Sequence, residues 1–331
     1  MDPEGAQLLS EVRRAYREHP GLRGKSALSL VGEVFGARDP VQGPGDDAAA
    51  VPDGDGFLLL AGEAIWPPFV ERDPYGAGIA AVVANANDVA AMGGRPVALV
   101  DAVVAAPTHA RRVLEGIRTG ADLYRVPVVG GHFTAREGPA ALSAFILGRA
   151  RALLPATAVR PGQTLLLACC LQGTLRPEIP AFTSVSERGA ALRDDLELLP
   201  RFAEEGCVRA AKDVSMAGIL GSLAMLLEPT GAGAVVLLDR IPVPPGVPLP
   251  IWLITFPTFG FLLAVDPGMA EEVRRPFQER GLACEAIGET DATGHLRVRS
   301  GDGEADLGTV RGVTGLRAGA IRRRTAGGRS P

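Results

Sequence analysis

Lysine and cysteine are both scarce in this chain of 331 residues, and each shortage excludes something. The only lysines are Lys25 and Lys212, so a phosphate site would depend on arginine, backbone N–H groups or a metal ion. No two cysteines form a C-x-x-C pair, and we expect them to be small apolar side chains in a reducing compartment. The four cysteines are Cys169, Cys170, Cys207 and Cys284.

Long apolar runs and a large excess of one charge are also missing. No run reaches the roughly 20 apolar residues that span a bilayer, and Met1-Asp2-Pro3-Glu4 lacks the basic and apolar parts of a signal peptide. The net charge of −4 gives no general attraction to nucleic acid or to an anionic membrane. With 47% hydrophobic and 22% charged residues, the composition is globular. We therefore expect a cytoplasmic protein that binds neither nucleic acid nor membrane.

The length is sufficient for two domains, and the two halves show a loosely similar order of strands and helices. The pattern changes between Leu153 and Gly162, where Arg160-Pro161-Gly162 predicts a turn before a new strand. Beyond Arg317 the chain is basic and without periodicity, which predicts disorder. The predicted parts are an N-terminal helical segment (1–40), a first α+β domain (41–152), a second α+β domain (153–316) and a disordered tail (317–331).

Hydrophobic periodicity, glycine and proline predict the secondary structure. The segment 171–188 is expected to be an irregular loop, and 241–250 a proline-rich turn region. Helices are predicted at 5–18, 26–35, 76–92, 109–124, 189–205 (one helix or two short ones), 215–227 and 269–280. Strands are predicted at 57–61, 96–104, 126–129, 140–148, 164–170, 234–238, 259–265 and 284–289.

Two adjacent aspartates, Asp46 and Asp47, follow the predicted turn Gly43-Pro44-Gly45 and precede the apolar strand 57–61. Like charges repel, so a pair placed between a turn and a core strand is naturally explained by a bound cation. A solvated acidic turn is the alternative for Asp-Asp alone. Glu63 follows the same strand and would lie near the acidic loop, or else on the surface.

A second acidic position lies in the predicted helix 76–92, which is otherwise rich in alanine and valine. Asn85 and Asp88 are three residues apart and therefore share a helix face. A buried carboxylate needs a cation or hydrogen-bond donors. The alternative is a capping or helix–helix hydrogen bond.

A third candidate is Lys212-Asp213-Val214-Ser215, directly before the predicted helix 215–227. An acid and a hydroxyl at a helix N-terminus suit a phosphate and its metal, and Lys212 adds a positive charge. The alternative is that Asp213 or Ser215 is simply the N-cap.

Gly130 and Gly131 follow the predicted strand 126–129 and are expected to form a glycine turn ahead of His132 and Thr134. Glycines let the backbone approach a phosphate closely. His132 is more commonly a structural turn residue in such a place. A transition-metal site on His132 is a further alternative, although the other histidines offer no ligand spacing.

These segments, in this order, resemble the superfamily of aminoimidazole ribonucleotide (AIR) synthetase, thiamine-monophosphate kinase and selenophosphate synthetase. The most specific match is the helix ending that runs from Asn85 to Pro96, which is similar to the family's Ala-Met-Gly-x-x-Pro. The resemblance covers about 43–289. The other matching motifs are Gly45-Asp46-Asp47-Ala48-Ala49, Val129-Gly130-Gly131-His132, Asp213-Val214-Ser215-x-x-Gly218 and Ile287-Gly288-Glu289.

The resemblance implies a two-domain α+β (PurM-like) fold whose N-terminal domains pair in a homodimer and close a β-barrel across the interface. It also implies ATP in a cleft near that interface, Mg²⁺ held by aspartates, and a small-molecule substrate. The resemblance implies that Asp46, Asp88 and Asp213 are catalytic and bind the metal, and that Gly131 and Ser215 contact the nucleotide. From the local sequence patterns we add Asp47 and Glu63 as candidate metal ligands, and Gly130, His132, Thr134 and Lys212 as candidate nucleotide contacts.

The chain also departs from the pattern of thiamine-monophosphate kinases. His132 and Met216 stand where those enzymes carry aspartates, Gly62-Glu63 replaces Thr-Asp, and Ala156-Thr157 stands where an arginine is expected. No cysteine precedes Cys169, which argues against selenophosphate synthetase activity. The expected function is an ATP- and Mg²⁺-dependent phosphotransferase or synthetase. The alternative is a diverged nucleotide- or metabolite-binding protein without turnover.

Overall fold

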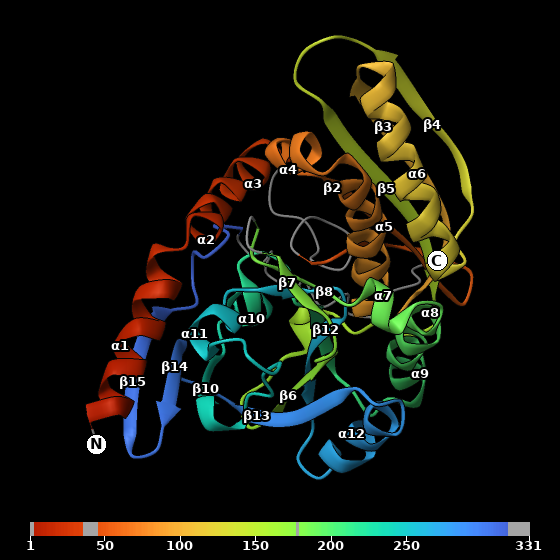
Figure 1. Cartoon of the computed structure of the whole chain (residues 1–331). Coiled ribbons are helices and arrows are strands. Elements are labelled where there is room, and N and C mark those ends of the chain that lie inside the picture. Colours follow the sequence, from red (N-terminus) through yellow and green to blue (C-terminus); the bar gives the residue numbers. More distant parts are fainter. Residues whose placement is uncertain (1–2, 36–45, 177–178, 317–331) are drawn as a thin grey trace, which may run out of the picture.

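The computed structural model describes residues 3–35, 46–176 and 179–316. It contains two α+β units, which we name the N-terminal domain (residues 49–150) and the C-terminal domain (residues 164–309), and a helical arm that precedes them (Figure 1). Within the described ranges, no helix combines the length and the apolarity needed to cross a membrane. The acidic turn expected at 43–45 and the tail expected at 317–331 lie outside the described residues.

The sheet of the N-terminal domain contains β1 (Ala49–Asp53), β2 (Gly56–Ala64), β3 (Arg95–Ala105), β4 (Val128–Ala135) and β5 (Ala141–Ala150). Its strand order is β1-β2-β5-β3-β4, and only β3 and β4 are parallel. Successive side chains of a strand point to opposite faces. Leu59 and Ala61 of β2 are therefore buried on one face, while Leu60 between them is exposed on the other.

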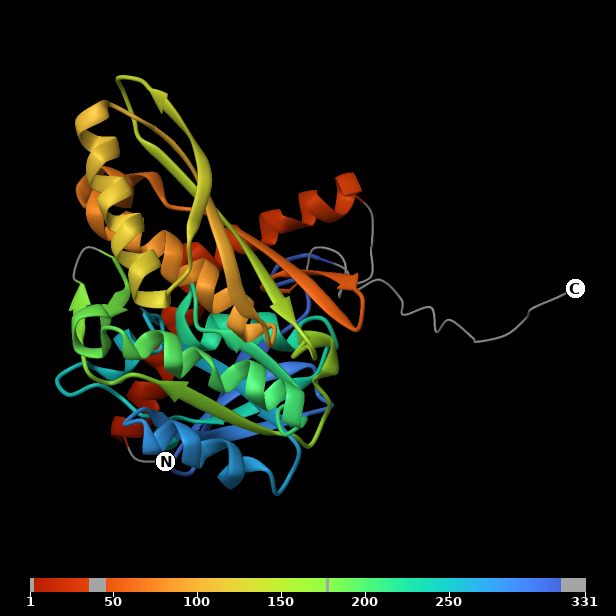
Figure 2. The same ribbon diagram turned by 90° about the vertical axis from the view of Figure 1, so that its right-hand side faces the viewer.

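Two long helices, α5 (Pro74–Ala91) and α6 (Pro107–Tyr124), cover one face of this sheet (Figure 2). The short helix α4 (Pro67–Arg72) precedes them. The two long helices approach closely because Gly78 of α5 and Gly116 of α6 lie where they cross. A Cβ at Gly78 would overlap the carbonyl oxygen of Val113. The glycines therefore set the distance between the two helices.

The other face of the same sheet has little cover within the described residues. Leu60, Val100 and Phe145 point away from the helices and are 53%, 36% and 49% exposed. The edge strand β4 is exposed at all of its residues. Gly62 gives space to the ring of Phe145, because a Cβ there would lie 2.5 Å from the phenyl Cδ1. This open face exposes large apolar side chains, which is unusual for a surface in water.

The main sheet of the C-terminal domain is buried on both faces. Leu165 and Leu167 of its central strand β6 pack on one side, and Leu166 and Ala168 on the other. The strand order is β15-β14-β10-β13-β6-β12-β9. These strands are β6 (Thr164–Cys169), β9 (Ala210–Asp213), β10 (Gly233–Leu237), β12 (Gly260–Val265), β13 (Ala283–Asp291), β14 (His295–Ser300) and β15 (Gly303–Thr309).

A small second sheet lies where the sequence predicts an irregular loop at 171–188, so that prediction is wrong. It contains β7 (Thr174–Arg176), β8 (Ala181–Thr183) and β11 (Phe256–Pro257). Its strands have only two or three residues, too few to show a period. The helices of the C-terminal domain are α7 (Val185–Arg188), α8 (Ala191–Leu196), α9 (Leu198–Glu205), α10 (Gly218–Leu227), α11 (Leu249–Trp252) and α12 (Ala270–Glu279).

The helical arm consists of α1 (Pro3–Glu18), α2 (Pro20–Lys25), a 3₁₀ turn at Ser26–Leu28 and α3 (Ser29–Phe35). The first helix buries Leu9 and Val12 in the core of the C-terminal domain, so the arm starts on that domain. From there it rises toward the N-terminal domain (Figure 1). Gly21 lies against Met216, since a Cβ there would be 2.7 Å from the sulfur.

Most predicted helices and strands are present, with boundaries shifted by a few residues. Besides the loop at 171–188, two local predictions are wrong. The strand expected at 126–129 continues to Ala135, so Gly130 and Gly131 lie inside an extended strand rather than in a turn. The helix expected from Ser215 begins at Gly218, with Ala217 as its N-cap, so neither Asp213 nor Ser215 caps it. The strands β1, β9, β14 and β15 and the short helix α4 were not predicted from the sequence.

Substituting Gly78 should test the helix crossing. We expect Gly78→Ala to lower the free energy of unfolding by about 1–3 kcal/mol, because the added methyl group forces two packed helices apart. Gly24→Ala in α2 is the matched control, since a Cβ there meets nothing within 4 Å. That variant should gain up to about 1 kcal/mol of helix propensity. Urea unfolding measures the stability of both variants. Equal stability of Gly78→Ala and Gly24→Ala would contradict the conclusion that Gly78 sets the distance between α5 and α6.

Candidate functional site

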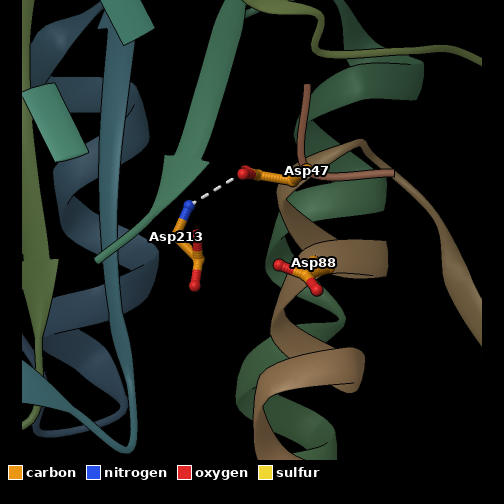
Figure 3. A group of neighbouring side chains, drawn as sticks. All are labelled: Asp47, Asp88 and Asp213. Atoms are coloured by element: carbon orange, nitrogen blue, oxygen red, sulfur yellow. Dashed lines mark hydrogen bonds between the residues drawn. The ribbon is translucent and has the colours of Figure 1, made fainter. Parts of the chain in front are cut away.

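Three aspartates from distant parts of the chain meet between the two domains. Asp47 precedes β1, Asp88 lies on α5, and Asp213 ends β9. One carboxylate oxygen from each lies within 4.8 Å of those of the other two. Figure 3 shows Asp88 pointing from its helix toward the other two side chains. We name Asp47, Asp88 and Asp213 the carboxylate cluster.

Secondary structure explains how Asp88 and Asp213 reach this position. Helix α5 is apolar on almost every side and is buried against β2 and β5, so Asp88 is only 7% exposed. Strand β9 is an edge strand that pairs with β12, where Asp213 lies opposite Phe261. This pairing directs the last residue of β9 to the boundary between the domains. Asp213 is 4% exposed.

Lys212 is the counter-charge of the cluster. Its Nζ contacts Oδ1 of Asp47 and lies 3.2 Å from Oδ1 of Asp213. The backbone N–H of Asp213 also donates to Oδ2 of Asp47 at 3.2 Å (Figure 3). Burial alone would lower the pKa of Lys212, but the negative charges of Asp47 and Asp213 outweigh it and raise that pKa well above its ordinary value. Lys212 is therefore charged.

The ionised form of the carboxylates in the cluster is disfavoured, and their pKa values are raised. Burial, opposed by Lys212 and reinforced by the charges of Asp213 and Asp46, raises the pKa of Asp47 to about 7. Burial and the charge of Asp213 raise the pKa of Asp88 well above its usual range. One lysine does not balance this much negative charge. A cation at the cluster would lower these pKa values and stabilise the charged form.

Glu63 and Asp46 flank the cluster in different ways. Glu63 lies on β2 and points to the same side as Leu59 and Ala61, toward α5, because side chains alternate along a strand. Burial, then the charge of Asp213, raises the pKa of Glu63. Asp46 is held by the backbone: its carboxylate accepts hydrogen bonds from the backbone N–H of Ala156 at 2.8 Å and of Asp47 at 3.0 Å.

Two asparagines beside Asp88 were not assigned a role from the sequence. The Nδ2 of Asn87 donates to the carbonyl oxygen of Thr258 in the C-terminal domain at 3.0 Å, and that of Asn85 to Ala81 and Ala144. The Oδ1 atoms of both asparagines are buried and have no hydrogen-bond partner among the described residues. The signal was present in the sequence, since three polar residues within Asn85–Asp88 interrupt an apolar helix.

The glycine motif does not join the carboxylate cluster within this chain. Gly130, Gly131, His132 and Thr134 lie on the edge strand β4, paired with β3. Of the side-chain contacts described for His132, its Nε2 lies 3.2 Å from Oγ1 of Thr134. The backbone N–H of Ser215 donates to Oγ of Ser222 at 3.0 Å. Their assignment as nucleotide contacts remains a prediction.

The donor set of the cluster suits a hard divalent cation. Mg²⁺ and Ca²⁺ prefer carboxylate, amide and water oxygens, and Mg²⁺ is commonly held by one or two protein carboxylates with phosphate oxygens. The three carboxylates of the cluster provide such ligands. In residues 3–35, 46–176 and 179–316, Asp47, Asp88 and Asp213 are the only group of three acidic, histidine or cysteine side chains close enough to hold a metal. His132 belongs to no such group.

This fold and site define a class of protein: two α+β domains with buried carboxylates at the boundary between them. The chain matches the family model "AIR synthase related protein, N-terminal domain" over residues 45–150. It matches "AIR synthase related protein, C-terminal domain" over residues 182–301. The chain therefore belongs to the AIR synthase-related superfamily, which confirms the family inferred from the sequence motifs.

Similar proteins agree with this placement. The uncharacterized protein sll0787 of Synechocystis sp. is 39% identical over 260 residues, which covers 78% of this chain and 81% of the relative. T. maritima PurL complexed with ATP has a TM-score of 0.68 at 22% identity, covering 86% of this chain and 49% of that one. AaThiL complexed with AMPPCP and TMP has a TM-score of 0.65 at 17% identity, covering 84% and 94%. This chain thus spans about half of that PurL. At these low identities the two structures establish the two-domain α+β fold alone.

The raised carboxyl pKa values predict a pH dependence of stability. A folded-state pKa above the unfolded value of about 4 means that folding binds protons. The resulting stability is present below about pH 4 and is lost as pH rises through about 7, the pKa of Asp47. We expect the free energy of unfolding of metal-free protein to fall by about 1–4 kcal/mol across that window.

Chemical denaturation in a chelating buffer at a series of pH values measures this loss. Asp47→Asn should flatten the profile, because amides do not titrate. Mg²⁺ should restore stability mainly at the upper end of the window, where the carboxylates are charged. A wild-type profile that stays level or rises between pH 4 and 7 would contradict the raised pKa values.

Proposed function

We propose that this protein is an ATP- and Mg²⁺-dependent phosphotransferase or synthetase that acts on a small molecule, in the manner of thiamine-monophosphate kinase. One observation carries the proposal: three separate segments bring Asp47, Asp88 and Asp213 within 4.8 Å of one another. The family supports it, because the superfamily includes ATP-using enzymes. Two structural neighbours, PurL of T. maritima and AaThiL, are complexed with ATP and with AMPPCP and TMP, respectively.

The chemistry of phosphoryl transfer agrees with this cluster. The reaction needs alignment and neutralisation of charge rather than a covalent nucleophile, so carboxylates holding Mg²⁺ are the expected apparatus. In this chain Asp47, Asp88 and Asp213 would hold the ion, with Glu63 beside them. The ammonium group of Lys212, which contacts Asp47 and Asp213, would also interact with the phosphate. Asp46, predicted from the resemblance as a ligand, would instead hold the loop by its bond to Ala156.

A nucleotide- or metabolite-binding protein without turnover is the second candidate. It is favoured by His132 and Met216, which stand where thiamine-monophosphate kinases carry aspartates. The thioether of Met216 is a soft donor, whereas Mg²⁺ takes oxygen ligands, so Met216 cannot replace an aspartate as a Mg²⁺ ligand. Fewer carboxylates would hold fewer Mg²⁺ ions. Steady release of ADP with an acceptor would exclude this candidate, and ATP binding without release for any acceptor would favour it.

Amide substitutions should separate the metal ligands from their neighbours. We expect wild-type protein to bind ATP only when Mg²⁺ is present. Asp47→Asn and Asp88→Asn should each weaken Mg²⁺-dependent ATP binding by about 10-fold or more, the usual cost of losing one charged hydrogen-bond partner. Asp53→Asn is the matched control, because Asp53 is an exposed aspartate of β1 that pairs with Arg149 at 2.7 Å. Isothermal titration calorimetry with and without Mg²⁺ measures the affinities.

Asp46→Asn belongs in the same series. If Asp46 is a metal ligand, as the resemblance implies, this variant should behave like Asp47→Asn. If it only holds the loop, its effect on Mg²⁺-dependent ATP affinity should be smaller, and its loss of thermal stability should be the same with and without Mg²⁺. Unchanged Mg²⁺-dependent ATP affinity in both Asp47→Asn and Asp88→Asn would remove the basis of the proposed function.

We also propose a homodimer that forms through the open face of the N-terminal sheet. Leu60, Val100 and Phe145 would be withdrawn from water there, and a partner sheet would pair the exposed edge of β4. Such pairing is the barrel that the resemblance implies. In such a dimer, Gly130 and Gly131 would lie at the interface between the subunits. The glycine motif of one subunit would then contact a nucleotide bound at that interface.

Multi-angle light scattering tests the dimer. We expect wild-type protein to elute at twice the monomer mass and Phe145→Asp to elute as a monomer, because a charge buried in an apolar interface is strongly unfavourable. Ile251→Asp is the control, since Ile251 is 43% exposed and Phe145 is 49% exposed, and Ile251 lies on the C-terminal domain. A monomeric wild type, or a Phe145→Asp variant that stays dimeric, would count against this interface.

A further inference from the structure

The chain has two lysines, and the structure places both near the carboxylates at the domain boundary. Lys212 contacts Asp47 and Asp213. Lys25 is the last residue of α2 in the helical arm, and no role for it was predicted from the sequence. Its position follows from the way in which α2 packs on the C-terminal domain.

Helix α2 lies against the segment that follows Asp213. Gly21 touches the side chain of Met216, since a Cβ at Gly21 would be 2.7 Å from the Met216 sulfur. The Cδ1 of Leu22 lies 3.6 Å from the position that a Cβ on Gly221 would take, in the first turn of α10. Two adjacent residues of α2 therefore contact the chain just beyond the last residue of β9.

Lys25 lies on the side of α2 that faces this segment. Residues three and four apart are neighbours on a helix, so Lys25 shares its face with Leu22 and Gly21. Lys25 is half-buried, whereas Arg23, on another side of the same helix, is exposed. A lysine can pack its hydrocarbon stem while its ammonium group reaches polar surroundings. The packing of α2 therefore directs a cation toward the site.

The charge of Lys25 acts on Glu63, the acidic residue beside the carboxylate cluster. Burial and the charge of Asp213 raise the pKa of Glu63, whereas Lys25 and Lys212 lower it. Within the described part of the chain, the Lys25 ammonium group makes no hydrogen bond or ion pair. Lys25 is thus near the acidic site without contacting an acid, and its three N–H donors are available to a ligand.

We propose that Lys25 binds a phosphate group held at the carboxylate cluster, and that the arm positions Lys25 for this contact. The inference rests on the proposed function, in which the cluster holds Mg²⁺ and the ion holds the phosphate. Lys212 is engaged by Asp47 and Asp213, whereas Lys25 has no such partner among the described residues. The phosphate is the terminal group of ATP or a group carried by the acceptor.

Two structural roles for Lys25 fit less well. If Lys25 served only to neutralise Glu63, the two side chains would form an ion pair, and none is present between them. If Lys25 were an ordinary surface lysine, it would be exposed in the way that Arg23 is. A phosphate between Lys25 and the cluster accounts both for the approach of the lysine and for the missing contact.

Calorimetric titration of the full chain with ATP in the presence of Mg²⁺ tests the proposal. If Lys25 holds a phosphate of ATP, Lys25→Met should weaken ATP binding by about 10-fold or more, because a charged hydrogen-bond partner is lost. Lys25→Arg keeps the cation and should retain most of the affinity. Arg23→Met is the matched control, since it removes one exposed charge from the same helix, and it should change the affinity by less than about 2-fold.

Titration with inorganic phosphate tests the other source of the group. If the acceptor carries the phosphate, Lys25→Met should leave ATP affinity unchanged and should weaken phosphate binding to the complex with ADP and Mg²⁺ by about 10-fold or more. A loss in either titration supports the proposal. The proposal is overturned if Lys25→Met changes neither affinity, or if Arg23→Met lowers the same affinity equally.

Chemical labelling gives a second readout that a purely structural lysine would not change. Lys212 is only 9% exposed, so an amine reagent such as acetic anhydride should modify Lys25 faster than Lys212. ATP with Mg²⁺, or inorganic phosphate with ADP and Mg²⁺, should slow the labelling of Lys25, as measured by mass spectrometry of its peptide. A labelling rate that neither ligand changes would also overturn the proposal.

Failure of this inference differs from failure of the proposed function. Wild-type protein that binds ATP with Mg²⁺, with ATP and phosphate affinities unchanged in Lys25→Met, would overturn the role of Lys25 alone. Wild-type protein that binds no ATP would contradict the proposed function. Titration with inorganic phosphate and Mg²⁺ then still tests Lys25, and an absence of phosphate binding to wild-type protein would overturn that role as well.

Discussion

The mutual repulsion of buried carboxylates is the constraint on which the rest of this structure depends. One carboxylate oxygen from each of Asp47, Asp88 and Asp213 lies within 4.8 Å of the others, with Glu63 close by. Among the described residues, Lys212 is the one buried cation that contacts the cluster, through Asp47 and Asp213. Folding therefore accumulates negative charge where the dielectric is low. A protein built for stability alone would place apolar residues there. The unfavourable free energy of burying these carboxylates together is explained if the site binds a positively charged ligand.

The acidic residues lie on helices and strands that also have a structural role in the two domains. Helix α5 is apolar and covers a sheet, and the same burial that stabilises it encloses Asp88. Strand β9 completes the edge of a second sheet, and its last residue is Asp213. The bond from Asn87 to the carbonyl of Thr258 ties the helix to the loop before β12, which is the strand that β9 pairs with. The positions of the two acids are thus linked through backbone structure.

Local sequence patterns were sufficient to predict Asp88 as a buried acidic residue. They were not sufficient to predict the positions of the residues around it. A lone acid in an apolar helix is visible in eighteen residues of sequence. The choice between Asp46 and Asp47 is decided by Ala156 and Lys212, which lie 110 and 165 residues further along the chain. Asp213 looked like a helix cap because the strand that contains it has four residues and pairs with a distant one. Gly130 and Gly131 looked like a turn because sequence does not show that β4 is an edge strand. Long-range pairing, rather than propensity, determined each of these positions.

The apolar core has a consequence for how ligands reach the site. One continuous group of buried side chains includes Leu59 and Val89 of the N-terminal domain together with Phe202 and Phe261 of the C-terminal domain. The domains therefore share one of the two hydrophobic cores, and swinging them apart would expose that core to water at a cost proportional to the area uncovered. Hinge opening is for this reason an expensive route of entry. Substrate exchange is expected to depend on loops and side chains at the rim, with the two domains moving as one body.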